Sequence, residues 1–297
     1  MSLPDAKRFQ SKLGKKFLVT MEVNPPKGTD LSDILKAVER VAPLVDAINV
    51  TDGSGAIMRA CSLAVAKAIL DAGVDPILQM TCRDRNRLAL QADLLGAGIF
   101  GIRNLLLLTG DDPKAGDHPD AKPVFDINSA ALMQVAKGLA EGKDMAGKEL
   151  KGAPAFCVGA AADPGAKDLD VEMQKFNAKI ASGAQFFQTQ AVFDADGFGR
   201  FMSKAKALGK PVLAGILLVK SAKMARYMNE HVWGIHVPDR LIERFERATD
   251  AKAECVAVTA ELIRAARPSA DGIHLYPLGW EALVPDILKR AGVEASS

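Results

Sequence analysis

Short apolar runs alternate with longer amphipathic stretches along the whole chain, and this unit occurs eight times. Each apolar run has the length of a strand, whereas each intervening stretch is long enough for a helix and spaces its apolar residues as helices do. Repeated strand–helix order predicts a parallel sheet covered by helices, and eight repeats favour closure into a barrel over an open doubly wound sheet. The apolar runs begin at Phe17, Asp46, Pro76, Ile102, Pro154, Ala184, Pro211 and Asp271. We therefore expect an α/β fold, a single (β/α)8 TIM barrel, with residues 1–297 forming one domain.

The amphipathic stretches set the expected helices. They cover residues 31–41, 57–72, 87–97, 127–141, 171–182, 196–208, the stretch 221–266, and 280–291. Gly73, Gly98 and Gly183 follow helical stretches and are expected to end them, because glycine adopts the left-handed conformation that closes a helix. Residues 109–125 and 160–167 are rich in Gly, Asp and Pro and are expected to be loops that follow strands.

Composition excludes several classes of function. The 38 Lys and Arg residues nearly balance 36 Asp and Glu residues, and aromatics make up 5% of the chain, so nucleic acid is not an expected partner. The four cysteines are scattered without metal-site spacing, so no metal centre is expected. The apolar runs are too short to span a bilayer, and the basic N-terminal segment does not resemble a signal peptide. A cytoplasmic protein without membrane contact is therefore expected.

Polar residues on the strands point to a site inside the barrel. Alternate side chains of a barrel strand face inward, so Glu22 is expected to share a face with Thr20 and Asn24. A half-buried carboxylate is costly unless it is paired or used, which favours a functional role over that of a barrel-core acid with a structural partner. The same parity pairs Asn49 with Thr51, Gln79 with Thr81, Gln188 with Gln190, and His274 with Tyr276. These pairs lie near the C-terminal ends of their strands, where barrel active sites form.

Three loops are also candidates for chemistry. Arg83 and Arg85 lie beside an expected helix N-terminus, which suggests an anion site for a cofactor phosphate. The alternative is a capped helix with solvated charges. The small-residue segment 52–56 approaches a second helix N-terminus, and Asp111 belongs to a carboxylate-rich loop expected near the barrel mouth. Asp112 and Asp117 are interpreted as turn residues of that same loop.

Two other patterns are interpreted as structural. The glycines of 96–101 satisfy a GxGxxG pattern, but they precede a strand at a helix end, whereas dinucleotide binding requires the opposite order. His231 and His236 flank Trp233 in an expected loop and are interpreted as surface or packing residues rather than metal ligands.

Seven segments, taken in order, resemble the methylenetetrahydrofolate reductase family. They are MEVNPPKG from Met21, NVTDG from Asn49, QMTCRDRN from Gln79, IRNLLLLTGDDP with GDHPDAKPVFDINS after it, VGAAADPGA from Val158 and FFQTQAVFD from Phe186. The TCRDRN and GDHP segments look most like the branch found in acetogenic bacteria and in fusions with homocysteine methyltransferase. The resemblance implies a TIM barrel that carries a flavin and reduces 5,10-methylenetetrahydrofolate to 5-methyltetrahydrofolate, an oxidoreductase of one-carbon metabolism and methionine biosynthesis.

The resemblance also implies roles for particular residues. Glu22 would be the general acid that opens the folate imidazolidine ring, and Asp111 would lie near both the pterin and the flavin. Gln190 would contact the folate or the nicotinamide, and Thr51 would lie near the nicotinamide and the flavin. The implied substrate set is completed by Phe193 and Tyr276. The implied cofactor set is Thr51, Asp52, Ser54, Gln79, Thr81, Arg83, Arg85, Thr109, Gly110, Asp111, Phe125 and Lys179.

Departures from the family pattern leave the electron donor open. Gln79 replaces a histidine and Thr109 an arginine of the better-known NADH-dependent members, while Ala222 replaces an aromatic that stacks on the substrate. The expected cofactor is FAD, with FMN as the alternative, reduced by NAD(P)H or by a partner subunit in a homo- or hetero-oligomer. Two other functions stay open: a flavin-free folate-dependent methyl-transfer or demethylation protein, and a folate-binding subunit.

Overall fold

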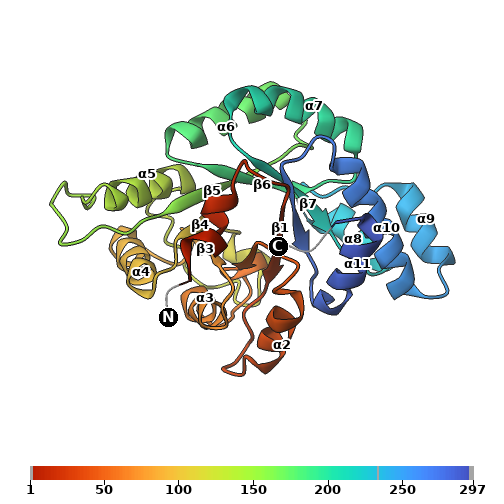
Figure 1. Ribbon diagram of the computed structural model, residues 1–297, viewed down its shortest axis with the longest axis horizontal. Helices are drawn as coiled ribbons and strands as arrows, with labels where there is room; N and C mark the ends of the chain where they lie inside the picture. The colour runs from red at the N-terminus through yellow and green to blue at the C-terminus, as the bar shows by residue number, and fades with distance from the viewer. Residues whose placement is uncertain (1–2, 233, 294–297) are drawn as a thin grey trace.

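The fold is a closed barrel of eight parallel strands, each hydrogen-bonded to the next in chain order, with the last strand pairing with the first (Figure 1). The computed structural model describes residues 3–232 and 234–293. The strands are β1 (Leu18–Val23), β2 (Ala47–Val50), β3 (Pro76–Thr81), β4 (Asn104–Leu108), β5 (Cys157–Ala162), β6 (Phe186–Ala191), β7 (Val212–Leu217) and β8 (Gly272–Tyr276). All eight expected strands and the (β/α)8 fold class are confirmed.

Helices form a ring around the barrel (Figure 1). They are α1 (Phe9–Lys12), α2 (Ser32–Val41), α3 (Ser62–Asp71), α4 (Arg87–Phe100), α5 (Ser129–Ala140), α6 (Leu169–Ala181), α7 (Ala195–Ala205), α8 (Ala222–His231), α9 (Asp239–Arg247), α10 (Ala251–Ala266) and α11 (Val284–Ala291). Short 3₁₀ turns are η1 (Asp5–Lys7), η2 (Ser54–Ala56), η3 (Pro113–Ala115), η4 (Lys206–Leu208) and η5 (Glu281–Leu283). No helix within 3–232 or 234–293 is long and apolar enough to cross a membrane.

Two helix expectations were wrong at their ends. Gly98 does not end a helix: α4 continues to Phe100, and Gly101 closes it with a φ of 79°. The helix expected from residue 57 begins only at Ser62, because residues 57–61 continue the loop that follows β2. The glycine stops at Gly73 and Gly183 are confirmed, with φ angles of 84° and 113°. The stretch 221–266 contains three helices, α8, α9 and α10.

The N-terminal segment closes one end of the barrel, a role that the sequence did not suggest. Phe9 of α1 is fully buried and packs edge-to-face on Phe186 of β6, with ring centroids 5.0 Å apart. Arg8 donates to the Asp75 carboxylate at 2.9 Å, and Asn104 donates to the same carboxylate at 2.7 Å. A buried ion pair with additional hydrogen bonds is specific in geometry, so it fixes α1 in place under the strands.

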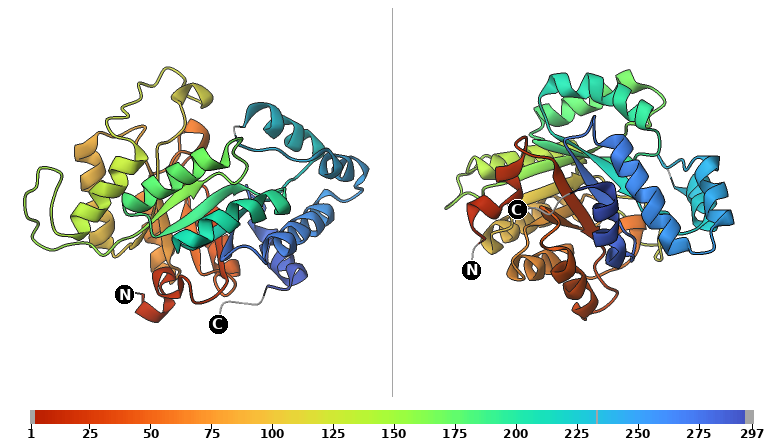
Figure 2. Two further views of the ribbon diagram at one scale, coloured as in Figure 1. Left: turned by 90° about the horizontal axis from the view of Figure 1, so that it is seen from above. Right: turned by 45° about the vertical axis from the view of Figure 1, so that its right-hand side comes forward.

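The barrel interior changes from apolar to polar along its axis. Near α1 it holds an apolar cluster composed of Phe9, Leu18, Ala47, Ile77, Leu106, Cys157, Phe186 and Leu213. The opposite end is the mouth at which the strands finish, and the loop 109–128 rises over this end (Figure 2, left). In the apolar cluster at the α1 end, the Phe186 ring fills the interior beside Gly159 of β5, where a Cβ would lie only 2.3 Å from that ring.

Candidate active site

A chain of buried polar side chains crosses the barrel between the apolar cluster and the mouth. Asn49 of β2 donates to the Gln188 side-chain oxygen at 2.7 Å, and Gln188 Nε2 donates to Thr20 Oγ1 at 3.1 Å. Thr20 Oγ1 lies 2.9 Å from Nδ1 of His274 on β8. These contacts run across the interior from β2 and β6 to β1 and β8, so the inward parity expected for these strands is confirmed.

Glu22 lies on the mouth side of these hydrogen-bonded side chains, near the C-terminal end of β1, and faces inward. It is 7% exposed, and its Oε2 is 3.8 Å from His274 Nε2. Within the described residues, no group donates a hydrogen bond to the Glu22 carboxylate. A nearly buried carboxyl group with a single imidazole neighbour is chemically uncommitted, which suits a group that exchanges a proton with a bound ligand.

Gln79 and Tyr276 border the same mouth. Gln79 of β3 is 7% exposed, and its amide makes no hydrogen bond to any residue that the structure describes. The Tyr276 hydroxyl donates to the Thr189 backbone oxygen at 2.7 Å, and its ring meets the His274 ring edge-on. Burial, followed by the nearby Glu22 charge, raises the pKa of Tyr276 well above its usual range. Tyr276 is therefore an uncharged side chain held in place by its hydrogen bond, whereas the Gln79 amide is available to a ligand.

Thr51, Asp52 and Thr81 brace the loops instead of facing open space. The Thr51 hydroxyl donates to the Asn24 side-chain oxygen at 2.8 Å. Asp52 accepts hydrogen bonds from the Thr81 backbone nitrogen at 2.8 Å and from its hydroxyl at 3.0 Å. Asp52 also pairs with Arg85. These contacts tie the end of β3 to the loop that follows β2.

The proposed anion site around Arg83 and Arg85 is already filled by the protein's own groups. Arg83 donates two hydrogen bonds to Asp84, at 2.8 and 2.7 Å, and a third to the Gly53 backbone oxygen. Arg85 pairs with both Asp52 and Asp93. The carboxylate partners raise the pKa of Arg83, led by the hydrogen bonds to Asp84. The local structure therefore matches the capped-helix alternative, with paired rather than solvated arginines.

The N-terminus of α4 is likewise satisfied. The Asn86 side chain caps it by accepting from the backbone nitrogens of Leu88 and Ala89, each at 3.1 Å. Asp126 accepts from the Arg87 backbone nitrogen at 2.9 Å and also pairs with its guanidinium. The amides that would bind an anion at a helix start thus already have acceptors.

The loop between β4 and α5 folds over the loop that follows β2. Asp111 is exposed, and its carboxylate accepts a hydrogen bond from the Gly55 backbone nitrogen at 2.8 Å. Asp112 caps η3, as a turn residue does, whereas Asp117 also reaches the Met58 backbone nitrogen at 2.9 Å and ties two loops together. Gly110 has a φ of 97° and packs against Thr81 and Arg83.

Ser54, Thr109 and Phe125 lie on the outer surface of these loops. Ser54 and Thr109 are exposed, and Thr109 hydrogen-bonds to Ser129. Phe125 is 37% exposed and holds a φ of 39°, an unusual backbone conformation for a bulky residue. Within the described residues, none of these three side chains forms a hydrogen bond or ion pair with Glu22.

Lys179 belongs to a compact charged cluster beside the end of β5. Its ammonium donates to the Ala161 backbone oxygen at 2.7 Å, and burial lowers its pKa. Asp163, in turn, is 8% exposed, and burial, with the Glu172 charge as a smaller contribution, raises its pKa. Gln190 lies near Asp163, since a side chain at Gly234 would touch both. This cluster and Gln190 border the mouth from the β5–β6 side.

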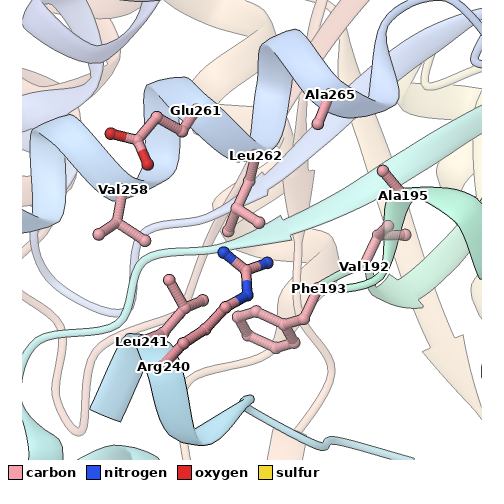
Figure 3. A pocket seen from close by; sticks show the side chains of 9 residues that line it. All are labelled: Val192, Phe193, Ala195, Arg240, Leu241, Val258, Glu261, Leu262 and Ala265. Carbon is pink, nitrogen blue, oxygen red and sulfur yellow. The ribbon is translucent and has the colours of Figure 1, made fainter. Parts of the chain in front are cut away.

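Phe193 lies on the loop after β6 and is 5% exposed. It lines a cavity of about 130 Å³ between the start of α7 and helices α9 and α10 (Figure 3). Arg240 and Glu261 face the same cavity from α9 and α10 (Figure 3). The structure therefore places Phe193 among the surrounding helices, and its predicted contact with substrate stays a prediction.

The same contacts test whether a flavin fits. The mouth offers uncommitted polar groups, Glu22 and Gln79, to a flat ring. In contrast, the three cations predicted for the flavin phosphates, Arg83, Arg85 and Lys179, are each held by carboxylates or a backbone oxygen. As arranged, these three residues do not fit a flavin diphosphate without first exchanging partners.

His274 is a site residue that the sequence-based assignment omitted. Parity predicted that it faces inward, but no role was given to it. The signal was available in the predicted barrel closure, which pairs β8 with β1; the register then sets Thr20 beside His274. Any inward residue on β8 must then lie beside the inward residues of β1.

The fold and the buried acid at its mouth define a (β/α)8 barrel with an enzyme-like polar site at the C-terminal ends of its strands. Residues 8–292 match the model of the family described as methylenetetrahydrofolate reductase. The chain belongs to this family.

Curated relatives show how much of other family members the chain represents. It is 24% identical to methylenetetrahydrofolate reductase 1 of Schizosaccharomyces pombe, over 94% of this chain and 46% of that protein. A probable methylenetetrahydrofolate reductase (NADPH) of Caenorhabditis elegans is 26% identical, with 78% and 34% covered. The chain thus spans half or less of these two relatives. It covers 90% of the 5,10-methylenetetrahydrofolate reductase of Pectobacterium carotovorum, at 24% identity over 93% of this chain.

Solved structures resemble the fold at low identity. A Clostridium thermocellum protein described as binding two copies of 5-methyl-5,6,7,8-tetrahydrofolic acid has a TM-score of 0.59 at 13% identity, covering 94% of this chain and 95% of its own. A 2,3-dimethylmalate lyase has a TM-score of 0.53 at 12% identity, covering 98% of this chain and 88% of its own. At these identities the likeness concerns the barrel alone.

Proposed function

We propose that the protein reduces 5,10-methylenetetrahydrofolate to 5-methyltetrahydrofolate. Membership of the methylenetetrahydrofolate reductase family supports the reaction class. The single observation that carries the proposal is Glu22, a nearly buried carboxyl group at the barrel mouth without a hydrogen-bond donor among the described residues. Ring opening of the methylene bridge needs a proton on a folate nitrogen, and a carboxyl group in this position can supply it.

The residues around Glu22 have complementary tasks in this proposal. Glu22 holds the proton and transfers it to a ring nitrogen, which opens the bridge to an electrophilic iminium. Gln79 and Gln190 offer amide donors and acceptors that can orient the pterin from opposite sides of the mouth. The apolar cluster and the Phe9 plug exclude water from below, so the charges near Glu22 act in a medium of low polarity.

The reduction also needs a hydride donor. FAD, or FMN in its place, is the cofactor that family resemblance suggests, with NAD(P)H or a partner subunit as the source of electrons. The paired state of Arg83 and Arg85 speaks against a flavin phosphate at that place in the present arrangement. The proposed reaction therefore rests on Glu22 and the folate site, and the identity of the donor is a separate question.

A second candidate follows from those paired arginines. A flavin-free folate protein, which carries or transfers the methyl group of 5-methyltetrahydrofolate, would need the pterin site but no phosphate cations. The Clostridium thermocellum structure, described as holding 5-methyl-5,6,7,8-tetrahydrofolic acid, supports folate binding by a barrel of this kind. Glu22 argues against a subunit that only binds folate, because binding alone needs no ring-opening proton.

One purification separates the two candidates. The visible spectrum of the purified protein reports bound flavin, and titration with FAD and FMN reports uptake. The protein is then mixed with 5,10-methylenetetrahydrofolate and, in parallel, with NADH, NADPH or chemically reduced flavin, and 5-methyltetrahydrofolate is measured. Formation of this product with any donor supports the reductase. Tight binding of 5-methyltetrahydrofolate without turnover under every condition would replace it with the second candidate.

A further inference from the structure

The strongest unassigned feature is the buried amide pair beneath the mouth. Asn49 and Gln188 exchange two hydrogen bonds, from Asn49 Nδ2 to Gln188 Oε1 at 2.7 Å and from Gln188 Nε2 to Asn49 Oδ1 at 3.1 Å. Both side chains are 2% exposed or less. Such a pair couples the orientations of the two amides, because rotating Gln188 alone would set like groups against each other.

The orientation of Gln188 determines what His274 meets. Gln188 Nε2 has two hydrogens, and one is used on Asn49. The other points between Thr20 Oγ1 at 3.1 Å and His274 Nδ1 at 3.3 Å. Thr20 Oγ1 accepts from Gln188, and its own hydrogen has two acceptors within reach, His274 Nδ1 at 2.9 Å and the Ile273 backbone oxygen at 3.3 Å. Of these two neighbours of Nδ1, the hydroxyl can donate or accept, whereas the Gln188 amide nitrogen can only donate.

We propose that Gln188, held by Asn49, is a positioning residue that fixes neutral His274 with its proton on Nε2, directed at Glu22. A nitrogen that faces the N–H of an amide keeps its lone pair, so Gln188 makes Nδ1 the acceptor and leaves the hydrogen on Nε2. Nε2 is the atom that lies 3.8 Å from Glu22 Oε2. The orientation of the Gln188 amide thus determines which nitrogen of His274 is protonated, and so which group faces Glu22.

The consequence concerns where the Glu22 proton can go. With hydrogen on Nε2, the imidazole lone pair is on Nδ1, so the nitrogen that faces Glu22 cannot take that proton, which remains available for a folate nitrogen. When Glu22 gives up the proton, Nε2–H faces the carboxylate charge that forms and stabilises it. His274 keeps its own proton throughout. This step rests on the proposed reductase function, but the tautomer itself does not.

Few charges surround this pair. The titratable groups that face His274 are Glu22 on β1 and Tyr276 on its own strand, and burial keeps the Tyr276 hydroxyl protonated by raising its pKa. The groups that contact it from β1 and β6 are the neutral hydroxyl of Thr20 and the neutral amide of Gln188. The tautomer of His274 is therefore set by hydrogen bonds rather than by neighbouring charges.

The tautomer can be observed directly by NMR of the full chain labelled with ¹⁵N in histidine. There are four histidines in the sequence, and three of them (His118, His231 and His236) are exposed, so His274 should be the one with a slowly exchanging ring proton. Long-range ¹H–¹⁵N correlation at neutral pH should show Nε2 protonated and Nδ1 bare. A protonated Nδ1, or a doubly protonated ring, in the wild-type protein would overturn the proposal.

Substitution of Gln188 tests whether this residue fixes the tautomer of His274. Gln188→Met keeps the length of the side chain but removes its donor, so the NMR signals of His274 should report a mixture of tautomers. The kcat for methylenetetrahydrofolate reduction should fall about tenfold while KM stays unchanged, since Gln188 lies below the folate site. Gln174→Met, an exposed position on α6, is the matched control and should change neither. An unchanged tautomer in Gln188→Met refutes the role of Gln188.

Two further results keep the outcomes distinct. Should Gln188→Met fail to fold, Asn49→Ser removes the partner amide with a smaller change, and the same mixture of tautomers is expected. A wild-type protein that shows the Nε2 proton but forms no 5-methyltetrahydrofolate with any donor would refute the proposed function alone. A wild-type protein that is active with its proton on Nδ1 would refute the inference alone.

Discussion

Replacing Glu22 with glutamine removes one proton from the proposed reaction and almost nothing else. Glu22→Gln conserves side-chain volume, so no cavity forms in a site that is only 7% exposed. The new amide oxygen can take the place of the carboxylate oxygen that lies 3.8 Å from His274 Nε2 in the wild type. A general acid contributes about 10²–10⁴-fold, and this one is too buried for bulk water to replace it freely. We expect a loss of about 10³-fold in the reduction step, or ~4 kcal/mol of transition-state stabilisation.

The assay should isolate proton transfer from electron delivery. Enzyme, reductant and 5,10-methylenetetrahydrofolate are mixed in a single turnover, and formation of 5-methyltetrahydrofolate is followed by rapid quench. Binding of 5-methyltetrahydrofolate, measured by calorimetry, should change less than threefold, because it needs no proton. Glu141→Gln, at an exposed position after α5, is the matched control and should behave as wild type. A Glu22→Gln rate within threefold of wild type would make Glu22 a structural acid of the barrel.

Three further predictions follow from described contacts. Asp84→Asn should release Arg83 and tighten FMN binding about two- to fivefold by fluorescence titration, with inorganic phosphate competing; unchanged affinity would mean that Arg83 does not meet a phosphate. Phe9→Ala should lower the free energy of unfolding in urea by about 3–5 kcal/mol, whereas exposed Phe125→Ala should cost under about 1 kcal/mol; equal losses would contradict the plug. Asp163 has a raised pKa when folded, so its ionised form destabilises the fold at neutral pH. Asp163→Asn should therefore raise Tm at neutral pH, with the gain vanishing below about pH 4, and a constant gain at both pH values would exclude this cause.

The alternation of side chains along each strand allowed the inward-facing residues of the site to be predicted from the sequence. Inward pairs such as Gln188 with Gln190 follow from the two-residue period of a strand alone, and barrel closure follows from eight repeats. The contact of Asn49 with Gln188 across the barrel was not predictable in this way, because parity says which side chains face inward but not which ones meet.

The charged loops show the opposite outcome. Arg83 and Arg85 beside a helix start predict an anion site equally well whether their charges are free or paired. Their partners, Asp84, Asp52 and Asp93, lie close in sequence or on a neighbouring loop, and only the three-dimensional arrangement decides which charge each arginine meets. Sequence alone therefore predicted where cations gather but not whether their charge is already neutralised.

The site also lies across the seam at which the barrel closes. Thr20 and His274 touch although 254 positions separate them along the chain, and Glu22 meets the same imidazole. Contacts between such distant positions form late in folding, because the entropy of closing a long loop is lost before the contacts contribute any stabilisation. During synthesis, Glu22 would leave the ribosome early, and nearly the whole chain would have to be made before His274 could contact it. Protection of the His274 ring proton during refolding would therefore time the closure of the barrel and the assembly of the site as one event.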